Sequence, residues 1–205
     1  MAYPEFFDLV PTISLFDPLA QLLGASDDGI IEVGYPEVVR AAGHSCPTVA
    51  SAYVMTLKAL EALWPDGTPE RGGIEVEFKQ GQDEGVAGVI GAVVSQITGA
   101  AGPGGFKGLA GNFNRSNLMH FERKIDGAAK LTRKDTGRSV EIGVNPDAVP
   151  PRPEAMPLLQ KILGQKAGPE DKAEFARLWQ DRVKRILIDH RDNPELVSVK
   201  VVEEG

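Results

Sequence analysis

The chain contains very little cysteine and histidine. Among its 205 residues there is one cysteine, Cys46, and there are three histidines. A single cysteine excludes a disulfide within the chain and a zinc site made of four cysteines from one chain. Any metal chemistry must therefore rely on a small number of residues, and the position of Cys46 becomes informative.

Excess positive charge and long apolar runs are also missing. The net charge is −7 and the pI is about 5.1, which argues against nucleic acid or an anionic membrane as the main partner. No stretch approaches eighteen apolar residues, so no transmembrane helix is expected. The first residues lack the basic segment of a signal peptide. We expect a cytoplasmic protein that binds neither nucleic acid nor a membrane.

Hydrophobic residues make up 42% of the chain, with 23 glycines and 15 prolines. This composition favours a loop-rich α+β domain. From Pro47, apolar residues recur every three or four positions, which predicts a helix that ends near Pro65. Residues 72–81 alternate apolar and charged side chains, which predicts a half-buried strand. Residues 84–98 predict a second buried helix, with Gly85, Gly88 and Gly91 along one side.

The remaining segments complete the predicted fold. Residues 5–24 predict short helical pieces separated by prolines, 29–35 a strand or loop, and 35–43 a short helix that ends at Gly43. A glycine-rich loop at 99–111 leads into a strand within 113–124, and 128–144 predicts a hairpin. The expected fold is α+β, with a mixed or antiparallel sheet packed against helices.

The C-terminal part predicts a helix-rich extension. Residues 145–157 contain five prolines and connect two parts of the chain. Helical patterns follow at 155–164 and 169–189, and a strand pattern at 195–204. We therefore divide the chain into an α+β metal-binding domain, 1–149, and an extension, 150–205. The apolar stripe of the extension packs either on that domain or on a second copy in a homodimer.

The sequence Gly-His-Ser-Cys-Pro at 43–47 places the single cysteine and one of the three histidines two positions apart. Proline suits the first position of a helix, so Pro47 predicts that Cys46 caps the helix. A thiol there faces the positive end of the helix dipole, which favours the thiolate that binds metals. His44 and Cys46 thus form a candidate ligand pair for Zn²⁺ or another divalent transition metal. A buried thiol beside a capping imidazole is the alternative.

A metal site needs at least one ligand in addition to His44 and Cys46. The candidates are His120, which follows a polar run, Asp17, an acid inside an apolar stretch, and a residue that a second chain would supply as a partner. In the loop before His120, Arg115 and Asn114 are candidates for binding a small anionic ligand or cofactor. They would otherwise be solvated loop residues.

The segment "GHSCPTVASAYVMTLKAL" resembles the signature of the formylmethanofuran dehydrogenase E-subunit family, and "GVIGAVVSQITGAAG" with "FKGLAGNFNRSNLMHF" is similar to its second block. The resemblance covers about residues 35–125. It implies an α+β metal-binding domain with His44 and Cys46 as the metal-binding pair. The cysteine-rich zinc ribbon of longer members is missing here.

Three functions remain open from the sequence, and whether the protein is an enzyme is not decided. The first is a metal-binding protein, with zinc as the expected ion, whose metal assists an unassigned reaction. The second is a non-catalytic accessory or cofactor-binding module of a redox enzyme. The third is a metal-free thiol enzyme with Cys46 as nucleophile and His44 as base.

Overall fold

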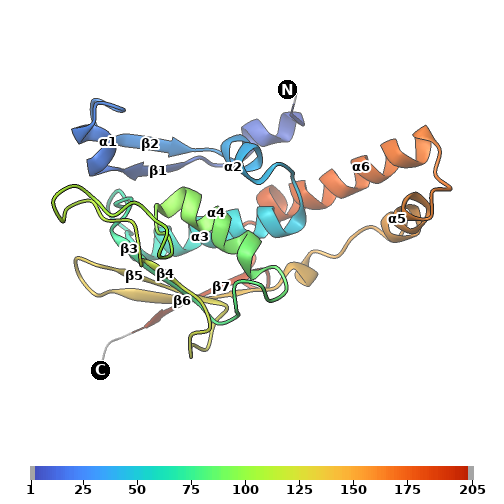
Figure 1. The fold of residues 1–205 in the computed structure, drawn as a ribbon. Helices are drawn as coiled ribbons and strands as arrows, with labels where there is room; N and C mark the ends of the chain where they lie inside the picture. Colours follow the sequence, from blue (N-terminus) through green and yellow to red (C-terminus); the bar gives the residue numbers. More distant parts are fainter. Residues whose placement is uncertain (1–2, 203–205) are drawn as a thin grey trace.

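The computed structural model describes residues 3–202. It has an α+β fold with one two-stranded and one five-stranded sheet (Figure 1). The strands are β1 (Ile13–Phe16), β2 (Ile30–Val33), β3 (Ile74–Phe78), β4 (Met119–His120), β5 (Ala129–Arg133), β6 (Ser139–Val144) and β7 (Val197–Val202). The helices are α1 (Pro18–Leu22), α2 (Tyr35–Ala42), α3 (Pro47–Leu63), α4 (Ala87–Thr98), α5 (Ala155–Leu163) and α6 (Pro169–Lys184). Short 3-10 turns lie at Glu5–Leu9 and Pro146–Ala148, and a π-helical turn, Arg185–Asp189, continues α6.

Helices α3 and α4 lie between the two sheets (Figure 1). The larger sheet has the order β4-β3-β5-β6-β7, and all its pairs are antiparallel except β3–β4. The expected mixed sheet packed against helices is therefore confirmed. Because α3 has neighbours on several sides, most of its residues are buried, including polar Ser51 and Thr56. This explains why nearly its whole sequence is apolar or small.

Local sequence signals set the bounds of several elements. Helix α3 begins at Pro47 and ends at Leu63, two residues before Pro65, as the sequence predicted. In β3, Ile74, Val76 and Phe78 are buried, and the glutamates between them are not. This alternation confirms that the strand has one face on the core.

The N-terminal segment differs from the prediction. Residues 5–24 were expected to form only helical pieces, but residues Ile13–Phe16 form β1, which pairs antiparallel with β2. Ile13 lies opposite Val33, and both are buried. Ile13 and Leu15 alternate with Ser14, a period of two that fits a strand rather than a helix.

The C-terminal extension is joined to the rest of the fold at one end and projects at the other. Strand β7 pairs with β6, and Val183, Ile186 and Leu187 are fully buried. Beyond these contacts, the N-terminal half of α6 and all of α5 form an arm that extends from the body (Figure 1). The strand predicted at 195–204 is observed as far as Val202, and 203–204 lie outside the described residues.

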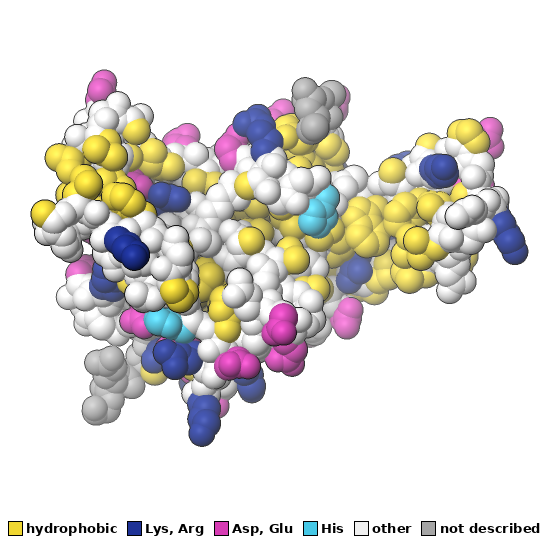
Figure 2. Space-filling view, in the orientation of Figure 1, with side chains coloured by type: hydrophobic (Ala, Val, Ile, Leu, Met, Phe, Trp, Pro, Cys, Tyr) yellow, Lys and Arg dark blue, Asp and Glu magenta, His cyan; other side chains and the backbone are white. Residues whose placement is uncertain are grey.

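Hydrophobic side chains gather along one side of the arm (Figure 2). Leu163 is 73% exposed and Met156 is 46% exposed. Between residues 3 and 202, none of the helices has the length and apolar character needed to cross a membrane.

Candidate metal centre

The Gly-His-Ser-Cys-Pro segment forms the turn between α2 and α3. Gly43 ends α2 with a φ of 76°, a left-handed conformation that glycine adopts without strain, and its N–H donates to the Val39 carbonyl at 2.9 Å. Cys46 is the N-cap of α3, in an extended conformation with φ −146°, and Pro47 follows at the first helical position. The turn predicted from Gly43 and Pro47 is thus observed, and it holds His44, Ser45 and Cys46.

The Cys46 thiol points toward the start of its own helix. Its Sγ accepts a hydrogen bond from the Val49 N–H at 3.5 Å, which is the side-chain contact of an N-cap residue. The side chain is partly buried and packs against the hydrophobic core. The sulfur is therefore held by the local backbone and remains partly accessible.

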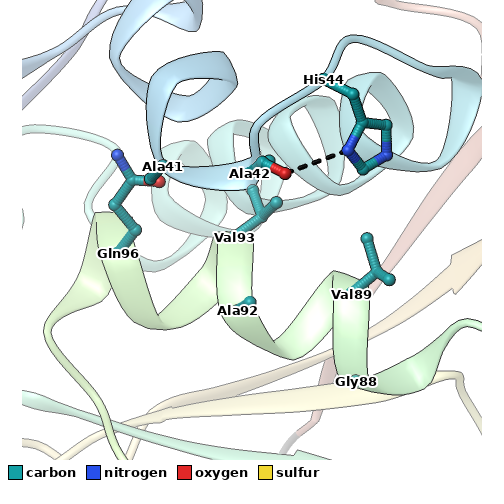
Figure 3. A pocket seen from close by; sticks show the side chains of 8 residues that line it. All are labelled: Ala41, Ala42, His44, Gly88, Val89, Ala92, Val93 and Gln96. Atoms are coloured by element: carbon teal, nitrogen blue, oxygen red, sulfur yellow. Dashed lines mark hydrogen bonds between the residues drawn. The ribbon is translucent and has the colours of Figure 1, made fainter.

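The His44 imidazole is oriented by a backbone contact. Its Nδ1 lies 3.0 Å from the Ala42 carbonyl oxygen (Figure 3). A carbonyl only accepts, so Nδ1 must carry the proton, and in the neutral ring Nε2 then carries the lone pair. Metal-binding histidines are commonly fixed by such a contact from the other ring nitrogen. His44 is exposed, so its Nε2 is accessible from outside.

A cavity of about 340 Å³ lies beside His44, between the end of α2 and one side of α4. Its walls are mostly apolar, and Val89 and His44 stand on either side of one end (Figure 3). Gly88 lies in its wall. A Cβ at this position would approach the Gln82 carbonyl oxygen to 2.7 Å, which favours glycine there. Gly91, the next glycine of the predicted stripe, packs instead against the Phe121 ring. This glycine pair thus allows close contacts with a loop and with the segment after β4.

Helix α6 contacts the middle residue of the turn. The Ser45 carbonyl accepts hydrogen bonds from Trp179 Nε1 and from Gln180 Nε2, each at 3.2 Å. The Ser45 hydroxyl donates to Gln180 Oε1 at 3.0 Å, so both ends of that amide bind one residue. The same hydroxyl lies 3.0 Å from the Tyr35 hydroxyl, which must be the donor because the serine proton is already used.

Sequence reasoning did not identify this contact. Ser45 is separated from Trp179 and Gln180 by 134 and 135 residues, and no local pattern links segments so far apart. The one related signal in the sequence was the apolar stripe of the 169–189 segment, which indicated that this segment packs against another surface.

Asp17 lies in a separate cluster of charges. It caps α1, and its carboxylate accepts from the Leu19 and Ala20 N–H groups. It also accepts from Arg71 at 3.0 Å and from Arg115 at 2.6 Å. Burial raises the pKa of Asp17, but the Arg71 hydrogen bond, the Ala20 N–H and the two guanidinium charges outweigh it and hold the pKa below its usual range. All four contacts engage this carboxylate within the fold.

Arg115 and Asn114 are also engaged internally. Burial lowers the pKa of Arg115, although the Asp17 carboxylate opposes this effect. The Arg115 guanidinium packs against Gly99, where a Cβ would come within 2.5 Å of Nη1. The Asn114 side chain bonds to the backbone and hydroxyl of Ser116. Both residues line a polar cavity of about 330 Å³ with Arg71, Lys134 and Glu70.

His120 lies in β4, where its Nε2 is 3.0 Å from a Glu75 carboxylate oxygen of the neighbouring strand. Within residues 3–202, no three His, Cys, Asp or Glu side chains are gathered closely enough to hold a metal ion. The structure therefore places His44 and Cys46 on one turn, and brings neither His120 nor Asp17 to them.

These features define a class: an α+β protein with a His-x-Cys turn between two helices and a C-terminal helix bound to that turn. Residues 41–193 match the model of the FmdE family, described as molybdenum formylmethanofuran dehydrogenase operon, and the chain belongs to this family. The matched region includes both the turn and α6. No curated protein matches the sequence.

Proposed function

We propose that this protein binds a divalent transition metal ion, with zinc the expected ion, through His44 Nε2 and Cys46 Sγ. The observation that carries the proposal is the Nδ1 contact of His44 with the Ala42 carbonyl, which leaves Nε2 with its lone pair. Imidazole nitrogen and thiolate sulfur are the donors that zinc and its neighbours prefer. The donor chemistry of the pair thus fits such an ion.

Two donors do not complete a coordination shell. Asp17 and His120 are each engaged by other side chains, with Arg71, Arg115 and Glu75 as their partners. The proposal therefore assigns the remaining positions to solvent, to a ligand or to a second copy of the chain. An ion with an open position supplies a Lewis acid or an activated water molecule, which is the chemistry expected if the protein is an enzyme.

Elemental analysis of the purified protein, stripped with a chelator and reloaded with zinc, tests this proposal. We expect one zinc ion bound per site in the wild type and less than about a tenth of that in His44→Ala and Cys46→Ser, since each variant leaves a single donor. His190→Ala is the matched control, because His190 lies at the end of the π-helical turn and should keep the wild-type content.

Equal zinc content in all four proteins would overturn the proposal. Light scattering on the same loaded and stripped samples reports whether a second copy completes the shell. If the measured mass of the protein doubles only in the presence of zinc, a second copy of the chain supplies the missing donor. An unchanged mass assigns it to solvent or a small ligand.

The cavity beside His44 favours a second candidate, the accessory or cofactor-binding module. Its volume of about 340 Å³ and its mostly apolar walls are those of a small-molecule site. Such a module would bind its ligand with or without metal. Ligand binding that survives in Cys46→Ser but not in a cavity-filling Ala92→Phe variant would support this second function.

A further inference from the structure

We infer that Trp179 and Gln180 of α6 are positioning residues for the metal site, which makes the C-terminal extension a part of that site. The inference rests on the proposed function and deepens it. It starts from the three hydrogen bonds that join these two side chains to Ser45.

Ser45 lies between the two proposed ligands, so its position fixes the chain on both sides. A peptide carbonyl that accepts two side-chain donors cannot rotate without breaking both bonds. On one side of this carbonyl is Cys46, and on the other is His44. The contacts from α6 therefore restrict the backbone torsions that aim the thiol and the imidazole.

The network continues into α2. The Tyr35 hydroxyl donates to the Ser45 hydroxyl, and Tyr35 is fully buried at the start of that helix. Burial raises the pKa of Tyr35, so its hydroxyl stays protonated and remains a donor. The turn is thereby fixed between α2 and α6 by buried or partly buried groups, and not only by its own backbone.

Contacts that orient metal ligands matter for metal affinity. Removal of such groups typically costs 10- to 100-fold in affinity. The α6 contacts orient the segment that carries both ligands, so we expect a loss of that order. An N-cap thiol and a histidine held only by a short turn would otherwise sample several arrangements.

The test uses cobalt(II) as the metal probe in the full chain. Trp179→Phe removes the indole N–H and keeps the aromatic ring, and Gln180→Met removes the amide and keeps the length of the side chain. We expect the double variant to bind cobalt about 10- to 100-fold more weakly than wild type. We also expect a change in the thiolate-to-cobalt absorption band, which reports ligand geometry.

A second readout needs no metal. The Val49 amide donates to Cys46 Sγ, so its hydrogen exchange reports how well the thiol is held. In metal-free protein we expect this amide to exchange at least about tenfold faster in the double variant, relative to the Trp64 amide at the other end of α3. If the wild type fails to bind cobalt, the proposed function is wrong. The ratio of Val49 to Trp64 exchange then still shows whether Trp179 and Gln180 position the Cys46 thiol.

Arg182→Met is the matched control. Arg182 donates to the Val149 and Pro146 carbonyls, so it also anchors α6 but does not contact Ser45. We expect it to lower stability and to keep cobalt affinity within about twofold of wild type. The inference is overturned if the double variant keeps both affinity and Val49 exchange, or if Arg182→Met loses as much affinity as the double variant.

Discussion

At the scale of single residues, Asp17 illustrates how a chemically suggestive side chain can be engaged by the fold. The sequence singled it out as an acid in an apolar stretch. In the structure it is 3% exposed and binds Arg71 and Arg115. The reason for its burial is thus a charge cluster that ties α1 to the end of α4, where Arg71 also donates to the Gln96 and Ile97 carbonyls.

We expect Asp17→Asn to lower the free energy of unfolding by about 3–5 kcal/mol at pH 7, because it leaves two arginines partly buried without their carboxylate. The folded pKa of Asp17 is lowered, so its contribution is present above the unfolded value of 3.8 and is lost as pH falls through the folded pKa. The difference between variant and wild type should therefore shrink below about pH 4. Urea unfolding of the wild type and the variant at pH 7 and at pH 3 measures the difference in unfolding free energy at each pH.

Asp192→Asn is the control for this prediction. Its side chain is 62% exposed and pairs with Arg191 and Lys58 at the surface. Exposed pairs contribute about 0–1 kcal/mol. A loss at pH 7 as large as that of Asp17→Asn would show that burial is not what distinguishes the two carboxylates.

At the scale of elements, the sequence predicted what local signals control. Pro47 and Pro65 bracket α3, the alternation in 74–78 identifies β3, and Gly43 ends α2. The prediction failed at β1, because the alternation in Ile13–Phe16 covers only four residues and the strand also needs its pairing with β2. The turn that holds His44 and Cys46 was predictable in the same way, since a proline and a glycine define it. Its link to α6 was not, because that link is a tertiary contact.

The two ends of the C-terminal helical segment should differ in their effect on stability. Ile186 is fully buried in the π-helical turn, whereas Leu163 at the end of α5 is 73% exposed. We expect Ile186→Ala to cost about 2–5 kcal/mol of unfolding free energy through the cavity it leaves. Leu163→Ala should stay within about 0.5 kcal/mol. Thermal or urea unfolding of the two variants measures this difference, and equal effects would contradict the packing of the π-helical turn in the core.

At the scale of the whole molecule, the predicted division at residue 149 separates parts that pack together. The segment after it supplies β7 to the main sheet and the buried side chains of Leu187 and Leu196. Without them β6 becomes an exposed edge and α3 loses a covering layer. In the first 149 residues alone, the turn that holds His44 and Cys46 would then lack both this part of the core and the α6 contacts.

We expect residues 1–149, expressed alone, to lack cooperative unfolding. Circular dichroism during heating and dispersion of amide proton shifts measure this directly. The full chain, prepared in parallel, should show a single cooperative transition. A well-dispersed spectrum and a sharp transition for the shorter chain would instead establish residues 1–149 as an independent domain.

The hydrogen bonds from Trp179 and Gln180 end on the main-chain oxygen of Ser45. Every amino acid carries that oxygen, so these two hydrogen bonds do not depend on which side chain stands at position 45, whereas the third, from the Ser45 hydroxyl to Gln180 Oε1, does. A substitution of Ser45 would thus remove one of the three hydrogen bonds, whereas loss of the donors at positions 179 and 180 would remove the other two. The backbone between His44 and Cys46 is therefore held by side chains that lie 134 and 135 residues further along the chain.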